Sequence, residues 1–372
     1  RSTDNMAYTT IDDPSKYFQI ALYTGNGNDD KSIPFSSANY TDEYVGQDIQ
    51  GDFFWVKRRD SGTDHWEIMD TVRGIGSTTY SLGFSTGVDG TESGTSNIIK
   101  SVQSNGMTLG TNPQVNRADE PYAAYIWKAG TTASATESGS NLAYSRSINT
   151  TSKFMISAYT GTGSGGDTLA HGLGSAPKFW ACKNRGASGW SWYVYHGANT
   201  SQPETENLYF NNNDATLDDA TRWDDTAPTG TEIAFGTNGG VNADGNTYMC
   251  YAWGEVQGFS KFGVYTGNGS ADGPYVYTGF RPSMLIIKRT DSTKDWYLYD
   301  DKRDTYNPQT TYFRTNSNDG EGTTDNYVDY LSNGFKLRGT SSVTNADGGT
   351  YVYMAWATHP FVTSTGVPCP AR

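Results

Sequence analysis

One short phrase recurs along the chain and limits the folds open to it. Tyr-Thr-Gly-Asn-Gly is written at residues 23–27 and 265–269, and Tyr-Thr-Gly-Thr-Gly stands between them at 159–163. Each copy closes an apolar run, and Asn-Gly is a strong tight-turn signal because both residues tolerate positive φ. We interpret each phrase as the end of the first strand of a duplicated module and the turn after it. These first strands are predicted to start near Phe18, Phe154 and Phe262.

A second shared phrase predicts a hairpin in each module. An apolar strand ends in a lysine, a polar loop follows, and a strand led by tryptophan returns. The three lysines are Lys57, Lys183 and Lys288. The three leading tryptophans are predicted to be Trp66, Trp190 and Trp296.

A closing phrase keeps a fixed spacing in all three modules. An asparagine (Asn116, Asn242 or Asn345) precedes a tyrosine by six residues and a tryptophan by eleven. Period-two alternation places Trp253 and Tyr251 on one face of a strand and the neighbouring aromatic and apolar residues on the other. Both faces are therefore apolar, as in the middle of a sandwich or at an interface between modules.

Composition agrees with a chain of many short strands. There are 43 glycines and only 18% charged residues, which favours strands joined by tight turns over amphipathic helices. We predict an all-β fold of three tandem antiparallel β-sandwich repeats of the concanavalin or jelly-roll type, each the size of one sandwich domain. The predicted limits are 1–17 for an N-terminal segment, 18–130 for repeat 1, 131–152 for a Ser/Thr/Gly-rich linker, 153–258 for repeat 2, 259–361 for repeat 3 and 362–372 for a tail. The short connection between repeats 2 and 3 predicts that these two are docked.

Charge and hydropathy exclude several classes of partner. The net charge of −13 argues against nucleic acid, because phosphate binding needs clustered Lys and Arg. No apolar stretch is long enough to predict membrane insertion, and no signal peptide is expected. The three cysteines form no even-numbered disulfide framework, and Cys182 and Cys250 are interpreted as small apolar strand residues.

Longer phrases carry a family resemblance. "TTIDDPSKYFQIALYTGNG", "SRSINTTSKF", "WDDTAPTGTEIAFGTNGGVNADGNTY" and "LSNGFKLRGTSSVTNADGGTYVYMAWATHPF" resemble a repeated domain of uncharacterised function in tail-fibre-like structural proteins of phages of marine and cyanobacterial hosts. The resemblance covers Thr9–Phe361. It implies a concanavalin-like architecture and a place in the virion, and it supplies no catalytic residues. One departure is that the "DTVRG" phrase after Trp66 is absent from repeat 2 and survives only as "DDKRD" in repeat 3.

The closing phrase offers one candidate metal site. Asn242 and Asp244, like Asn345 and Asp347, faintly suggest a calcium loop, but such a loop needs five or more oxygen ligands and a closing Glu, so a turn leading into a strand is favoured. No metal or cofactor is predicted.

Paired carboxylates of a glycosidase would share one surface at a separation of roughly 5–9 Å. Glu67 and Asp70 should point to opposite faces of a strand, and the adjacent pairs 224–225 and 300–301 should diverge. No histidine recurs among the modules, although His196 stands where the others have aspartate, and no nucleophile elbow is present. The chain is therefore predicted not to be an enzyme.

Aromatic residues in polar loops are the predicted carbohydrate contacts, since the repeated tryptophans are expected in the core. The candidates are Tyr40, Tyr44, Trp223, Tyr275, Tyr306 and Tyr327.

The expected function is that of a tail fibre or tail-associated fibre on the virion surface, made in the host cytoplasm. Repeated weak sites would contact host surface polysaccharide with avidity. Other virion proteins and copies of the same chain, in a trimer, are the expected partners. A capsid decoration or sheath protein and a polysaccharide depolymerase are the alternatives.

Overall fold

The protein is built almost entirely of antiparallel strands. The computed structural model describes residues 8–35, 49–60, 62–76, 79–84, 92–130, 132–134 and 141–368. All strand pairs within these ranges are antiparallel, which confirms the all-β prediction. The helices described are single turns: η1 (Pro14–Lys16), α1 (Pro113–Asn116), η3 (Pro203–Thr205), α2 (Ala220–Trp223) and α3 (Gly239–Asn242).

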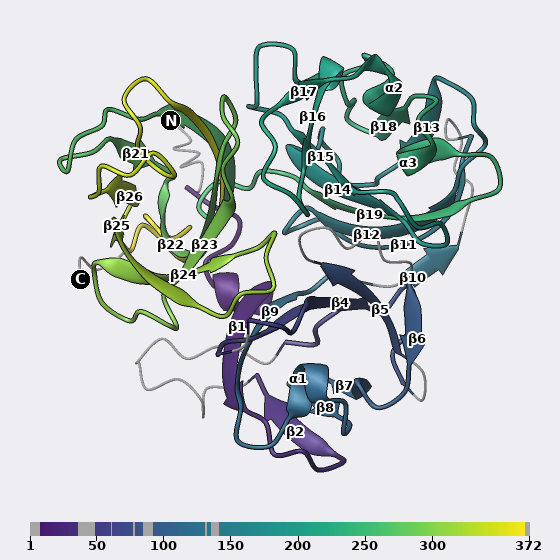
Figure 1. Ribbon diagram of the computed structural model, residues 1–372, viewed down its shortest axis with the longest axis horizontal. Coiled ribbons are helices and arrows are strands. Elements are labelled where there is room, and N and C mark those ends of the chain that lie inside the picture. The colour runs from purple at the N-terminus through teal and green to yellow at the C-terminus, as the bar shows by residue number, and fades with distance from the viewer. Residues whose placement is uncertain are drawn as a thin grey trace, which may run out of the picture.

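Three sheet-bearing segments form three lobes around a common centre (Figure 1). We name them the first segment (18–130), the second segment (132–258) and the third segment (259–361).

The strands of the first segment form two sheets. The larger has the order β1 (Phe18–Thr24), β9 (Pro121–Trp127), β3 (Phe53–Arg58), β4 (Trp66–Asp70), β5 (Thr79–Phe84), β6 (Ser93–Thr95). The smaller has the order β2 (Lys31–Pro34), β8 (Gly106–Leu109), β7 (Ile99–Gln103).

The second segment repeats this plan with a longer sheet. Its order is β10 (Thr132–Ser134), β11 (Ala143–Asn149), β12 (Phe154–Thr160), β19 (Thr247–Trp253), β14 (Phe179–Asn184), β15 (Trp192–His196), β16 (Glu206–Tyr209), β17 (Leu217–Asp218). A two-stranded sheet pairs β13 (Asp167–Ala170) with β18 (Glu232–Phe235).

The third segment has one continuous, strongly curved sheet. Its order is β20 (Ser260–Thr266), β27 (Thr350–Pro360), β22 (Phe280–Arg289), β23 (Trp296–Asp300), β24 (Gln309–Arg314), β25 (Gly322–Leu331), β26 (Gly334–Leu337), β21 (Tyr275–Tyr277).

The recurring phrase has the predicted role in each segment. Strands β1, β12 and β20 all end at the threonine of the phrase, and the glycines that close the turns, Gly27, Gly163 and Gly269, have φ of +67°, +79° and +62°. A side chain there would be strained, which explains why glycine recurs. Strands β1 and β12 begin at the predicted residues, whereas β20 begins two residues before Phe262.

Two details differ from the sequence prediction. Strand β15 is led by Trp192, which lies opposite Lys183 just as Trp296 lies opposite Lys288, whereas Trp190 lies in the loop before it. The stretch 131–152, predicted as a linker, contains strands β10 and β11 of the second sheet. A Ser/Thr-rich sequence can form a strand when an open sheet edge beside it accepts its backbone hydrogen bonds.

The closing strand is covered on both faces, as predicted. Trp253 and Tyr251 of β19 lie in a core shared by all three segments, while Tyr248 and Cys250 lie in a core of the second segment alone. The first and third segments have private cores of the same kind. Each large sheet therefore has one face on the shared core, which we call the central core.

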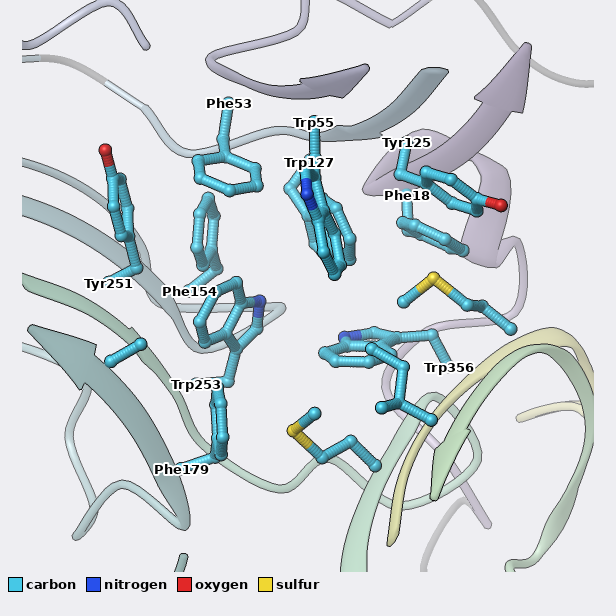
Figure 2. Packing of buried hydrophobic residues seen from close by; sticks show 14 of the residues in the cluster. Phe18, Phe53, Trp55, Tyr125, Trp127, Phe154, Phe179, Tyr251, Trp253 and Trp356 are labelled. Carbon is cyan, nitrogen blue, oxygen red and sulfur yellow. The ribbon is translucent and has the colours of Figure 1, made fainter. Parts of the chain in front are cut away.

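Three tryptophans meet at the middle of the central core (Figure 2). The ring centroids of Trp127, Trp253 and Trp356 lie 5.4–6.0 Å apart, with interplanar angles of 69–75°. Edge-to-face packing of this kind adds to the stabilisation from buried area. An apolar cavity of about 40 Å³ lies beside them and is lined by residues of all three segments.

Buried ion pairs lie on two of the three contacts between segments. Asp70 accepts a hydrogen bond from Tyr251 of the second segment at 2.8 Å and forms a fully buried pair with Arg73 at 2.5 Å. Asp300 accepts from Tyr125 of the first segment at 2.7 Å and pairs with Arg303 at 2.5 Å. The "DTVRG" phrase therefore supplies an aspartate and an arginine to a contact between segments.

Each of these contacts includes a glutamate and a second arginine. Glu92 lies between Arg73 and Arg185, and Glu321 lies between Arg303 and Arg59. We call each set of five side chains a charged seam.

The third contact has the same architecture, but uncharged side chains take the places of the aspartate, glutamate and arginines. His196 occupies the aspartate position and faces the backbone carbonyl of Tyr353 at 3.1 Å. The Asn199 side chain accepts a hydrogen bond from the Thr216 hydroxyl. The backbone N–H of Thr216 donates to the Thr290 carbonyl, and the backbone N–H of Glu321 donates to the Arg59 carbonyl in the same way. Thr216 and Thr290 therefore take the places of the glutamate and the second arginine. Met354 stands where the other closing strands have tyrosine. We call this the neutral seam.

Candidate functional site

One side of the third segment carries an exposed aromatic and charged surface. Strand β21 alternates, with Val276 buried and with Tyr275 and Tyr277 exposed by 45% and 52%. In the neighbouring strand β26, Lys336 lies opposite Tyr275, and Lys336 in turn lies opposite Asp329 of β25. Residues opposite one another in adjacent strands share a face, so both tyrosines lie on the same side of the sheet as this charged pair.

A network of ion pairs fixes the charged groups on this face. Asp272 lies 2.6 Å from the Lys336 ammonium and 3.9 Å from the Arg338 guanidinium, and Arg338 lies 3.1 Å from Asp329. The hydrogen bond from Lys336 lowers the pKa of the exposed Asp272 carboxyl, with the lysine charge adding to the effect. Carboxylates and a guanidinium are thus presented together to solvent.

A shallow hollow opens between these groups. It is lined by Ala271, Asp272, Pro308, Tyr327, Asp329 and Arg338. Tyr327 precedes Asp329 by two residues in β25 and so shares its face. We call the side chains of Tyr275, Tyr277, Tyr327, Asp272, Asp329, Lys336 and Arg338 the tyrosine face.

The loop that carries Tyr306 borders the hollow. Asn307 exchanges two hydrogen bonds of 2.8 Å with the backbone of Tyr330 in β25, which places Pro308 at the hollow. Tyr306, exposed by 79%, precedes this anchored residue. The third segment therefore holds three of the six predicted carbohydrate contacts.

The other three candidates lie elsewhere. Tyr40 and Tyr44 lie outside the described residues. Trp223 is fully buried, donates its indole N–H to the Glu206 carbonyl at 3.0 Å, and packs edge-on against Trp180. The one-turn helix α2 directs this side chain into the core of the second segment, so no ring face is available to a sugar. The prediction that Trp223 is a surface contact is therefore wrong.

Sequence reasoning missed Tyr277, Asp272, Asp329, Lys336 and Arg338. The signal was period-two alternation. "YVY" places two tyrosines on one face of a strand. "GFKLR" places its lysine and arginine on one face and the buried Phe335 and Leu337 on the other face of the same strand.

The asparagines of the closing phrase are structural. Asn242 accepts from the Thr162 N–H at 3.0 Å and donates to the carbonyls of Ser164 and Gly236 at 2.8 and 3.0 Å. Asn345 makes the equivalent bonds, while Asp244 and Asp347 are exposed. Within the described ranges, no three His, Cys, Asp or Glu side chains are grouped where they could hold a metal ion.

The acidic residues considered for catalysis are separated or paired with bases. Glu67 is buried and accepts from Ser81, and burial raises its pKa to about 7. Burial alone would raise the pKa of Asp300, but the Arg303 charge and the hydrogen bonds that Asp300 accepts outweigh it, and the pKa is lowered. Asp70 belongs to the other charged seam. These groups stabilise contacts inside the fold and do not line the hollow.

Comparison with family models finds one family that matches most of the chain. The model described as "Domain of unknown function (DUF7483)" matches residues 13–360. The chain belongs to this family. The matched range of this DUF7483 chain covers all three segments and the central core that they share. No curated protein matches it. Among the described residues, no helix of this DUF7483 protein is long and apolar enough to cross a membrane.

Proposed function

We propose that this DUF7483 protein is a virion surface protein, a tail fibre or tail-associated fibre, and that its tyrosine face contacts host surface glycans. The observation that carries the proposal is the grouping of Tyr275, Tyr277 and Tyr327 with carboxylates and a guanidinium on one exposed face. The resemblance of its phrases to phage fibre proteins supports the setting in the virion.

The chemistry of the face suits a sugar ring. Tyrosine offers an apolar ring to the C–H face of a pyranose and a hydroxyl at its edge. Asp272 and Asp329 can accept hydrogen bonds from sugar hydroxyls, while Arg338 can donate to them. A shallow, solvent-filled site of this kind binds weakly, so several copies of the chain on one particle would be needed for firm attachment.

The face belongs to the third segment, and this alters the expected route to avidity. In the second segment the strand that corresponds to β21 is β13, whose sequence Asp-Thr-Leu-Ala has no aromatic residue. The matching strand of the first segment, β2, reads Lys-Ser-Ile-Pro. Among the described strands the face therefore occurs in the third segment alone, and we expect avidity to come from copies of the chain held side by side.

A glycan array probed with the purified chain tests the proposal. Tyr327→Ala and Tyr275→Ala are each expected to weaken binding to the glycans that bind the parent chain by roughly threefold to tenfold, since one stacking ring is worth about 0.5–1.5 kcal/mol. Tyr80→Ala is the matched control, because Tyr80 is a partly exposed strand tyrosine of the first segment, exposed by 37%. Equal losses in all three variants, or no glycan bound above background, would contradict the proposal.

A further inference from the structure

Among the described residues, no strand pairs with the outer edge of strand β20 in the third segment. The Phe259 carbonyl accepts from Ala357 at 2.8 Å, and the Gly267 N–H donates to Gly349 at 2.9 Å, so odd-numbered residues of β20 exchange hydrogen bonds with β27. The backbone groups of Phe262, Val264 and Thr266 therefore point away from β27.

The matching edge in the second segment is filled. The same pattern of hydrogen bonds, from Gly254 to Lys153 and from Gly161 to Asn246, leaves the alternate residues of β12 pointing outward. Strand β11 pairs with β12 along its full length, and Ser147 and Ser145 lie opposite Ile156 and Ala158. Ile156 and Ala158 of β12 correspond to Phe262 and Val264 of β20. Strand β11 therefore shows which kind of strand pairs with such an edge.

No strand takes this place on β20 within the described part of the chain. There β20 pairs with β27 alone, and no backbone hydrogen bond from a turn or loop reaches Phe262, Val264 or Thr266. Val264 is one of the few large apolar side chains that are exposed, at 48%.

The edge also lacks the usual protection against pairing. Open edges are commonly guarded by proline, bulges or outward charges. Strand β20 has no proline, pairs with β27 in an unbroken register, and has a single charged residue, Lys261, whose ammonium lies 2.8 Å from Glu255. These seven residues can therefore accept an added strand through their outward backbone groups.

In the described part of the chain no strand pairs with the second sheet edge beside β20, and the Tyr8 hydroxyl donates to the neighbouring Gly279 carbonyl at 2.7 Å. In the second segment, Arg146 of β11 donates to the Ala170 carbonyl of β13 at 2.8 Å, which ties the added strand to both halves of the sandwich. In the third segment the strand in that place is β21. The bond from Leu337 N–H to Pro274 shows that Tyr275 and Tyr277 turn their carbonyls away from β26. The Tyr277 carbonyl of the third segment thus occupies the position of the Ala170 carbonyl in the second segment, which accepts the hydrogen bond from Arg146.

We propose that the edge of β20 is a docking site for one extended strand of a partner polypeptide, which adds antiparallel to β20 as β11 adds to β12. The strand has the chemistry of β11: small polar residues that alternate with larger ones, and an arginine that reaches the Tyr277 carbonyl. Side-chain size at Val264 and the carbonyl positions on β21 set its register. This interaction is independent of glycan binding.

A labelled peptide tests the proposal directly. The peptide Asn-Leu-Ala-Tyr-Ser-Arg-Ser-Ile-Asn-Thr-Thr, the sequence of residues 141–151, is titrated into the whole chain and followed by fluorescence anisotropy. Saturable binding of one peptide per chain is expected. The peptide with arginine replaced by alanine should bind more weakly, because it cannot donate to the Tyr277 carbonyl.

Backbone methylation of the peptide tests the register without altering the protein. In β11 the backbone of Ser147 faces β12, whereas that of Ile148 faces the other way. N-methylation at the Ser147 position should abolish binding, and N-methylation at the Ile148 position should leave it nearly unchanged. Equal effects at both positions would overturn the proposal, because they would indicate contact through side chains alone.

Two protein variants locate the binding edge. Val264→Pro removes an outward N–H that β27 does not use, so the sheet should keep its fold while the peptide binds at least roughly tenfold more weakly, about 1.4 kcal/mol. Leu22→Pro makes the same change at the matching position of β1 and should leave binding unchanged; circular dichroism and melting temperature check the fold of both. Binding lost in Leu22→Pro but not in Val264→Pro, or self-association of the chain through β20 in place of peptide binding, would overturn the proposal.

Discussion

At the scale of single residues, the asparagine and tyrosine of the closing phrase hold two turns in place by hydrogen bonds. The Tyr248 hydroxyl accepts from the Ala243 N–H and donates to the Gly239 carbonyl, both at 2.7 Å, and Asn242 bonds the turn after the first strand. The same bonds recur around Tyr122 and Tyr351. The Asn-to-Tyr separation is fixed because the tyrosine hydroxyl binds both ends of the short turn that contains the asparagine. The sequence revealed this spacing but not the partners of the asparagine in the turn after the first strand, since those lie far away in the chain.

The neutral seam makes a residue-scale prediction about pH. His196 is buried, its Nδ1 accepts from the Ala198 N–H, and its Nε2 donates to the Tyr353 carbonyl. Burial lowers the pKa of His196 to about 4. A histidine with a depressed folded-state pKa contributes stability above its unfolded pKa of about 6.5, and this contribution is lost as the pH falls toward 4.

Urea unfolding of the parent chain and of His196→Gln between pH 7 and pH 4 measures this contribution. Relative to the variant, the parent should lose about 3 kcal/mol of unfolding free energy over this range, an order-of-magnitude figure from about 1.4 kcal/mol per pKa unit. The comparison cancels Glu67, whose raised pKa acts in the opposite direction. A difference between the two proteins that does not change with pH would contradict the assignment.

At the scale of elements, the hairpin strands and the closing strands were readable from sequence because their period-two patterns are strong. The order of the hairpin strands followed as well, apart from the exchange of Trp190 for Trp192. The two strands within 131–152 were not readable, because a polar segment forms a strand only when a neighbouring sheet edge is available. The tyrosine face was half readable. Tyr275 and Tyr327 stood out as aromatics in polar surroundings, whereas the ionic partners depend on pairing across strands.

The seams give an element-scale prediction. Asp300→Ala should cost about 3–5 kcal/mol of unfolding free energy, because it leaves the buried Arg303 charge without its nearest partner and with Glu321 3.7 Å away. Replacing the whole charged seam by its neutral counterpart should cost less than that single change, because no buried charge is left over. The five substitutions are Asp300→His, Arg303→Asn, Glu321→Thr, Tyr125→Met and Arg59→Thr.

Chemical denaturation of the single and the five-fold variants measures both losses. A conservative Asp300→Asn variant serves as the control for shape, since it keeps the side-chain volume and removes the charge. If the five-fold variant is less stable than Asp300→Ala, the two kinds of seam are not interchangeable.

At the scale of the whole molecule, the three segments are tied together by the central core. Each large sheet buries one face against the other two, so a single segment on its own would expose a face rich in tryptophan and phenylalanine. Docking of the second and third segments was expected from their short connection. The equal involvement of the first segment was not, because composition does not show which faces are buried together.

Trp356→Ala tests this cooperativity. Removing one of the three central rings should cost about 3–5 kcal/mol. The loss should appear as a shift of one transition shared by the whole chain, since Trp356 contacts both Trp127 and Trp253. Unfolding followed in parallel by circular dichroism and tryptophan fluorescence measures it. Val264→Ala, at an exposed position, is the control and should change stability by less than about 0.5 kcal/mol. Separate transitions for the three segments would refute a single cooperative unit.

The two ends of the described chain lie against each other. Tyr8 packs edge-on against Phe361 at a centroid distance of 6.3 Å, and the Ser364 N–H donates to Asp12 at 2.6 Å. A domain whose two ends lie side by side can be inserted into a surface loop of another protein without separating the residues that flank the insertion.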